Sequence, residues 1–189
     1  MPARIECLQA SEGQELQNGI TVAYTSLNHP DGVFAYKLQD PAGTLVYTGD
    51  TEHDGTHDGP RFQRRFGHSD QRLIRFATGA HTLLADAQYT PEEFDPAGHG
   101  KPGMAKKGWG HSTYVSAINI AVQAGVRRLI LTHHDPGHDD KKMSEISERA
   151  KEYACQELAA QGLAEHALEV VVAKEGLKVM IGNESQKAQ

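Results

Sequence analysis

The chain has 189 residues, a hydrophobic share of 38% and a formal net charge of −6. This length allows one domain with a hydrophobic core and is short for two, and the negative charge argues against a dedicated nucleic-acid-binding protein, because counterion release needs a basic face. No apolar run reaches the roughly 18 residues of a membrane span, the N-terminus lacks a signal-peptide core, and the two cysteines have no zinc-knot spacing. We therefore expect one cytoplasmic domain, 1–189, that makes no membrane contact.

The N-terminal half alternates short β-rich runs with turn formers. The pattern predicts four strands, over 20–24, 33–38, 44–48 and 82–85. Residues 40–43 contain proline and glycine and indicate a hairpin between the second and third strands. A polar, arginine-rich loop follows, and a short helix is expected to begin at Ser69 or Asp70 and to end near Gly79.

The C-terminal half begins with a long irregular segment, 91–110, of a kind that is usually functional or mobile. Helical spacing then predicts one helix from Ser112 to Gly125 and a longer one from Asp139 or Asp140. The remaining expected elements are a buried strand over 129–131, a closing hairpin of strands 168–173 and 177–181, and a frayed tail at 183–189.

Imidazole and carboxylate groups follow several of these predicted strands. The candidate site residues are His29, Asp50, Asp86, His111 and His133. Two imidazoles and a carboxylate are suitable donors for zinc, manganese or iron, and a shared carboxylate such as Asp50 can bridge two ions. A water held by paired ions gives a nucleophile for phosphoester or acyl hydrolysis. The competing interpretation is that these side chains cap helices or bind water.

The chain contains eleven histidines, and most are expected to have no role in a site. His134 and His138 are predicted to be solvated loop residues. The other histidines assigned to the surface are His53, His57, His68, His99 and His166.

Five short motifs occur in a fixed order along residues 20–140. They are Asn28-His29-Pro30 with Tyr36 behind it, Tyr47-Thr48-Gly49-Asp50-Thr51-Glu52, Ala85-Asp86-Ala87-Gln88-Tyr89-Thr90, Gly110-His111-Ser112-Thr113, and Leu131-Thr132-His133-His134-Asp135-Pro136. Each motif alone is weak, but their order resembles that of metallo-β-lactamase-fold hydrolases. The resemblance is closest to the cyclic-nucleotide-phosphodiesterase-like and ribonuclease Z-like branch.

This resemblance implies an α/β fold, a four-layer αββα sandwich with a two-metal site at its edge. It assigns His29 to one zinc ion, His133 to the other, and Asp50 to a bridge between them, with manganese or iron as alternative metals. It also implies that His111, oriented by Asp86, contacts the scissile phosphate or assists the leaving group. The hydroxide between the ions would attack phosphorus in line.

One departure from the family is large. The principal metal motif, His-x-His-x-Asp-His, precedes the position of His29 in the family, whereas residues 1–28 contain no histidine. The chain therefore resembles the C-terminal half of the fold, and each ion would have about two protein ligands where three or four are usual. A half-fold also exposes apolar sheet surface, so a complementary N-terminal half or a second copy is the expected partner.

Three explanations of the missing half stay open: a truncated gene product, one subunit of a split enzyme, or a degenerate member used for binding. The leading functional prediction is a metal-dependent hydrolase of small phosphodiesters. The alternatives are a non-catalytic interaction module or inactive fragment, and a thioester or lactam hydrolase. The loops at 53–70 and 91–110 are predicted to border the substrate cleft.

Overall fold

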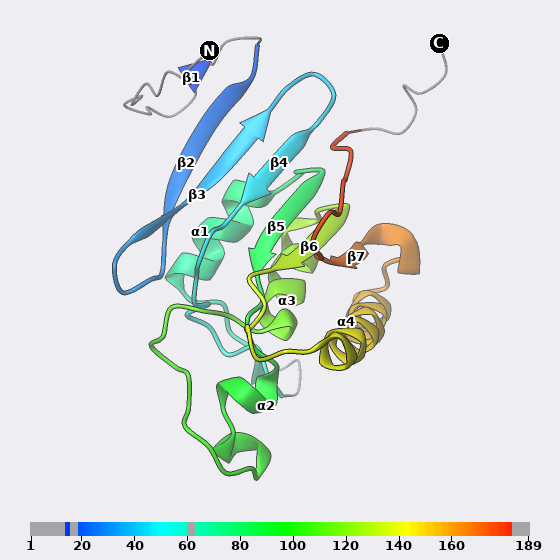
Figure 1. Ribbon diagram of the computed structural model, residues 1–189. Helices are drawn as coiled ribbons and strands as arrows, with labels where there is room; N and C mark the ends of the chain where they lie inside the picture. The colour runs from blue at the N-terminus through cyan, green and yellow to red at the C-terminus, as the bar shows by residue number, and fades with distance from the viewer. Residues whose placement is uncertain (1–13, 16–18, 60–62, 183–189) are drawn as a thin grey trace.

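The computed structural model describes residues 14–15, 19–59 and 63–182 (Figure 1). Its centre is a seven-stranded sheet in chain order: β1 Gln14–Glu15, β2 Thr21–Leu27, β3 Val33–Gln39, β4 Thr44–Tyr47, β5 Thr82–Asp86, β6 Arg128–Thr132 and β7 Glu169–Val172. The helices are α1 His68–Ala77, α2 Pro91–Phe94, α3 Tyr114–Ala124 and α4 Asp140–Ala160, with 3-10 turns η2 Ala97–His99 and η3 Glu165–Ala167.

The direction of the strands explains where the loops gather. β1 to β4 pair antiparallel, whereas β4, β5, β6 and β7 pair parallel. The carboxyl ends of β2, β4, β5 and β6 therefore lie at one edge of the sheet. The loops that follow these strands carry the histidines and aspartates predicted to form a site.

Three helices connect the parallel strands and cover one face of the sheet. Right-handed crossovers that all run in the same direction place their helices on the same side. In agreement with this rule, α1 packs against α3 and α3 against α4 (Figure 1). The central helix α3 is the most buried, and it begins at Thr113, whose hydroxyl accepts the Ser116 N–H, and ends at Gly125 with φ 64°.

Alternation along the strands separates a covered face from an open one. The side chains beneath the helices are buried and include Ala35, Val46, Leu83, Leu129 and Leu131. The opposite face carries one cross-strand row in register, formed by Tyr24, Tyr36, Tyr47, Leu84, Ile130 and Val171. Tyr36 and Tyr47 in this row are 41% and 43% exposed, and neighbouring Phe34 is 45% exposed. This open aromatic face agrees with the expectation for half of a two-sheet sandwich.

Most predicted elements are confirmed, with ends that differ by a few residues. The predicted first strand extends to Leu27, and the helix expected from Ser112 begins one residue later, with Thr113 as its cap. The helix expected from Asp139 or Asp140 is α4, in which the Asp139 side chain accepts the Lys142 N–H.

The predicted closing hairpin is wrong. β7 pairs in parallel with β6, because the long helix α4 returns the chain to the starting edge of the sheet, and residues 177–181 form no strand. Leu177 and Met180 are exposed, so this segment has no buried face that would favour pairing. The predicted tail at 183–189 lies outside the described residues. Among the helices that are described, none has the length and apolar character needed to cross a bilayer.

Candidate metal centre

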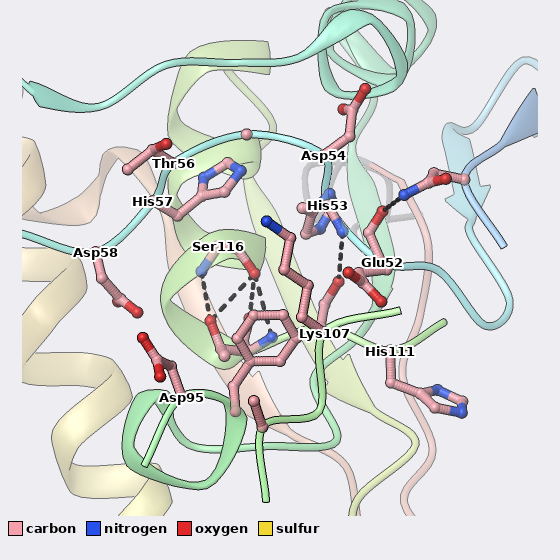
Figure 2. A pocket seen from close by; sticks show the side chains of 16 residues that line it. Glu52, His53, Asp54, Thr56, His57, Asp58, Asp95, Lys107, His111 and Ser116 are labelled. Carbon is pink, nitrogen blue, oxygen red and sulfur yellow. Dashed lines mark hydrogen bonds between the residues drawn. The ribbon is translucent and has the colours of Figure 1, made fainter. Parts of the chain in front are cut away.

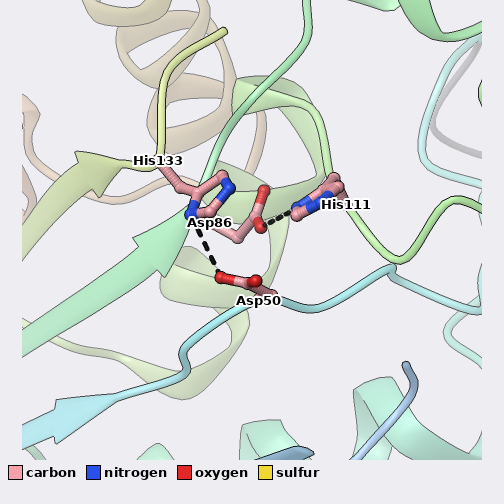
Figure 3. Close-up of side chains that lie close together, drawn as sticks. All are labelled: Asp50, Asp86, His111 and His133. Carbon is pink, nitrogen blue, oxygen red and sulfur yellow. Dashed lines mark hydrogen bonds and ion pairs between the residues drawn. The ribbon is translucent and has the colours of Figure 1, made fainter. Parts of the chain in front are cut away.

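Four side chains converge where the parallel strands end. Asp50 follows β4, Asp86 ends β5, His133 follows β6, and His111 precedes α3. Each offers an oxygen or nitrogen atom that could bind a metal, and these atoms all lie within 4.8 Å of one another (Figure 3). These residues are distant in the chain but lie close together, because the parallel strands β4, β5 and β6 end at the same edge of the sheet.

Asp50 and His133 form the exposed half of this group. Asp50 Oδ1 lies 3.0 Å from His133 Nδ1, and the side chains are 42% and 41% exposed. Among the described residues, His133 is the only non-glycine residue with a positive φ, at 58°. Such a conformation costs about 1–3 kcal/mol and is often found at functional sites. The strain turns the imidazole back toward Asp50 instead of along the strand direction.

Asp86, which is buried, and His111, which is 16% exposed, form the less exposed half. The Asp86 carboxylate is buried and accepts four donors: the backbone N–H groups of Thr51, Gln88 and Ser112, and Nδ1 of His111 at 2.8 Å. With both oxygens already engaged, Asp86 is better suited to orienting His111 than to binding an ion. The His111 ring stacks on His133, with ring centres 4.6 Å apart, and its Nε2 stays available.

His29 lies beside the group but not in it. Its ring centre is 6.1 Å from that of His111, and its Nδ1 accepts the Asp31 N–H at 3.2 Å. In the neutral tautomer this bond leaves the ring proton on Nε2, so ligation by His29 requires a rearrangement. Gly110 packs against the same ring, where a Cβ atom would come within 2.4 Å of His29 Cδ2. The predicted metal role of His29 stays a prediction.

The prediction that His134 and His138 are solvated loop residues is wrong. Both ring nitrogens of His134 are buried, and the His138 side chain is 7% exposed with its Nε2 3.1 Å from Glu93 Oε1.

The surface assignment of two further histidines is also wrong. His53 Nδ1 and His57 Nε2 each lie 2.9 Å from an oxygen of Asp70, and all three side chains are buried. Burial acts to raise the pKa of the Asp70 carboxyl, but the hydrogen bonds from His53 and His57 outweigh it and hold that pKa well below its usual range. No local pattern indicated this burial, because it depends on the contact between α1 and the loop that follows β4.

The two long loops predicted to border a cleft line one cavity of about 490 Å³ (Figure 2). Residues 52–58 form one wall, and Phe94, Asp95, Ala105 and Lys107 form another. The backbone near His111 closes the cavity, while the His111 ring points away from it. Of the four residues in the metal group, only His111 is among the residues that line this cavity, so the prediction that these loops border the substrate cleft stays a prediction.

Two residues near the group were not singled out from the sequence. Glu52 is buried, and its carboxylate accepts N–H groups from Gly108 and Gly110. Tyr89 is buried edge-on to His111, and burial, followed by the nearby carboxylates of Asp135 and Asp86, raises its pKa. The glycines on both sides of Trp109 were the only available signal for a specially shaped loop at this position.

Comparisons with known proteins place this arrangement in a fold family. No protein-family model matches the chain. An uncharacterised protein of Mycobacterium tuberculosis is 30% identical over 118 residues, which is 62% of this chain and 33% of that protein. Ribonuclease Z of Brevibacillus brevis is 32% identical over 101 residues, or 53% of this chain and 24% of the enzyme. The chain thus spans a third or less of these curated relatives.

Solved structures decide the fold. The metallo-β-lactamase fold protein YhfI of Bacillus subtilis superposes with a TM-score of 0.59 and 21% identity, covering 89% of this chain and 53% of YhfI. This chain has a metallo-β-lactamase fold. The short form of human tRNase Z gives a TM-score of 0.51 at 17% identity, covering 87% of this chain and 44% of that one.

A third structure, Zn²⁺-bound PqqB of Methylobacterium extorquens, has a TM-score of 0.51 at 15% identity and covers 91% of this chain and 51% of PqqB. About half of the metallo-β-lactamase fold is therefore present, as predicted.

Proposed function

We propose that this chain contributes one half of a metal-dependent hydrolase centre that cleaves small phosphodiesters. The observation that carries the proposal is the convergence of Asp50, Asp86, His111 and His133 at one sheet edge. Its support from relatives is the similarity to a ribonuclease Z in sequence and to a tRNase Z in fold.

The donor set fits a divalent ion. Zinc takes nitrogen and carboxylate oxygen ligands at about 2.0–2.2 Å, so two ligand atoms on one ion stand about 3 Å apart. Asp50 Oδ1 and His133 Nδ1 have this separation, at 3.0 Å. Zinc or manganese would be held by these two residues, with His29 as the proposed ligand of a second ion. A bound ion supplies Lewis acidity and lowers the pKa of a water molecule.

Asp86 and His111 supply proton transfer. Asp86 holds the Nδ1–H of His111, which leaves Nε2 as the atom that can reach a substrate oxygen. An imidazolium at this position is stabilised by the Asp86 carboxylate and can deliver its Nε2 proton to a departing alkoxide. His111 would thus act as the general acid and Asp86 as its positioning residue.

We further propose that the open face of the sheet binds the complementary half of the fold. Phe34, Tyr36 and Tyr47 present exposed aromatic surface on this face, which in a two-sheet sandwich packs against a second sheet. The same complement would add ligands to Asp50 and His133, whose side chains are about two-fifths exposed.

Metal analysis and a paired substrate assay test the enzymatic proposal. Chain loaded with zinc or manganese is expected to retain metal and to hydrolyse bis-p-nitrophenyl phosphate in preference to a thioester, slowly because the ligand set is incomplete. His133→Ala should abolish both properties, whereas the control His68→Ala, which changes an exposed histidine on α1, should retain them. Turnover of the thioester alone contradicts the phosphodiesterase proposal. Absence of bound metal contradicts the metal centre and favours a non-catalytic interaction module.

Light scattering and binding of a hydrophobic dye test the open face. The wild-type chain should bind the dye or self-associate as its concentration rises, and Tyr36→Lys should reduce both effects. Glu148→Lys on the exposed side of α4 is the control. A wild-type chain that stays monomeric and binds no dye would show that this face needs no partner.

A further inference from the structure

Two buried side chains join the segment that delivers His111 to the loop that follows β4: Ser112, whose Oγ donates to the Thr51 carbonyl, and Glu52, which binds the residues before His111. Both oxygens of Glu52 accept the Gly108 N–H, at 2.9 and 2.7 Å, and Oε2 also accepts the Gly110 N–H at 3.1 Å. Glu52 is only 8% exposed and stands two residues after Asp50. A carboxylate inside the protein is therefore bound by backbone N–H groups of the chain segment that leads directly into His111.

The shape of this segment depends on its glycines. Gly108 and Gly110 have φ values of 85° and 88°, in the left-handed region that favours glycine. Backbone conformations of this kind turn neighbouring N–H groups toward a common point and form a concave anion-binding surface. Here Glu52 occupies that surface, and Trp109 projects between the two bound residues with 49% exposure.

The backbone of Glu52 makes a second attachment. The Glu52 N–H donates to the Asn28 carbonyl at 2.9 Å, and the Asn28 side-chain amide donates to the Glu52 carbonyl at 3.0 Å. The residue after Asn28 is His29, so Glu52 joins the loops that carry His29, Asp50 and His111. Few other residues could replace it, since aspartate is one methylene shorter and glutamine offers one acceptor oxygen in place of two.

We infer that Glu52 is a positioning residue for His111: its carboxylate fixes segment 108–111 so that the imidazole meets Asp86 and stacks on His133. The inference rests on the proposed function only in naming His111 as the catalytic acid. Its structural content is that removal of this carboxylate frees segment 108–111 and loosens His111, while the sheet and α3 stay folded.

Three measurements on the full chain test the inference with Glu52→Gln. Amide hydrogen exchange at Gly108 and Gly110 should become about tenfold faster or more, because hydrogen bonds to a charged group are lost. Trp109 is the only tryptophan, so acrylamide quenching of its fluorescence should rise. The ¹⁵N shifts of the His111 ring should move from a single Nδ1–H tautomer toward a tautomer average, which a general loss of stability would not cause.

Glu157→Gln is the matched control, since Glu157 is equally buried but binds Arg64 beneath α4. It should leave all three readouts at their wild-type values. Glu52→Asp keeps the charge but shortens the side chain by one methylene, so it tests whether charge alone is enough. It is expected to behave like Glu52→Gln. The inference is overturned if Glu52→Asp behaves like wild type, if Glu52→Gln changes none of the readouts, or if Glu157→Gln changes them equally.

These readouts need no turnover, so they stand even if the chain hydrolyses no phosphodiester. Where turnover is measurable, Glu52→Gln should lower kcat more than it changes KM. In that case a change confined to KM would contradict a positioning role.

Discussion

Two groups of histidine and aspartate lie near the carboxyl ends of β4, β5 and β6, and they differ in how far their side chains are exposed to solvent. In the buried group, Asp70 uses one oxygen on His53 and the other on His57, and its side chain has no solvent exposure. In the other group, Asp50 and His133 are about two-fifths exposed, they form an ion pair with each other, and the His133 ring also stacks on His111.

This difference teaches that residue type and spacing do not identify a metal centre. His53 and His57 are closer in sequence to Asp50 than His133 is, and both groups consist of histidine and aspartate. What separates the groups is solvent exposure: Asp50 and His133 face solvent, whereas the second ring nitrogens, His53 Nε2 and His57 Nδ1, are buried without a hydrogen-bond partner among the described residues. The buried group has a structural role, because its hydrogen bonds attach residues 53–57 to α1. The exposed group retains the capacity to bind an ion.

The largest effect is expected from Asp70→Asn, which should remove the stabilising role of the buried group. Replacing this carboxylate leaves buried imidazole partners without their hydrogen-bond acceptor, at a cost of about 1–3 kcal/mol for each group left unsatisfied. Urea unfolding should therefore show a loss of at least about 2 kcal/mol. Asp140→Asn, at an exposed position in the first turn of α4, should cost no more than about 1 kcal/mol. Equal losses in the two variants would show that the Asp70 group does not stabilise the fold.

The same carboxyl should make stability depend on pH in acid. The pKa of Asp70 is lower in the folded chain than in the unfolded chain, so the unfolded chain binds more protons in acid. The stabilisation is therefore fully present above the unfolded-state pKa of about 3.9. It is lost as the pH falls from there toward the folded-state pKa. Thermal unfolding between pH 5 and pH 2 should show this fall in the wild type, and Asp70→Asn should have a flatter profile. Parallel profiles would assign the acid sensitivity to other carboxyls.

The smallest of the three effects concerns the exposed group, and it tests whether His29 is a metal ligand in this chain. His133→Ala should weaken zinc binding by about 100-fold or more, because it removes a proposed ligand and loss of an orienting partner alone costs about 10–100-fold. His29→Ala should change the affinity of this chain by less than about threefold, since His29 lies outside the converging group and its Nδ1 already accepts the Asp31 N–H. Titration calorimetry measures both constants. A His29→Ala loss that matches the His133→Ala loss would place His29 among the ligands.

Local sequence patterns determined most strands and helices. Val33 to Gln39 and Thr44 to Tyr47 were recognisable from β-rich composition around a turn, and α4 from its spacing and its Asp139 cap. The pattern also indicated that polar groups at strand ends would form one site and that His29, Asp50 and His133 would converge. The structure brings Asp50 and His133 together with Asp86 and His111, whereas His29 lies beside this group. Their roles as ligands and proton donors stay predictions.

Tertiary structure alone decided the rest. It paired β7 with β6 in place of a hairpin, buried His53 and His57 against Asp70, and set Glu52 against the Gly108 and Gly110 amides. Each of these contacts joins segments that local periodicity treats as independent. A side chain's burial and its partner depend on what the rest of the chain packs over it, and that is a property of the assembled sheet and helices rather than of any window of sequence.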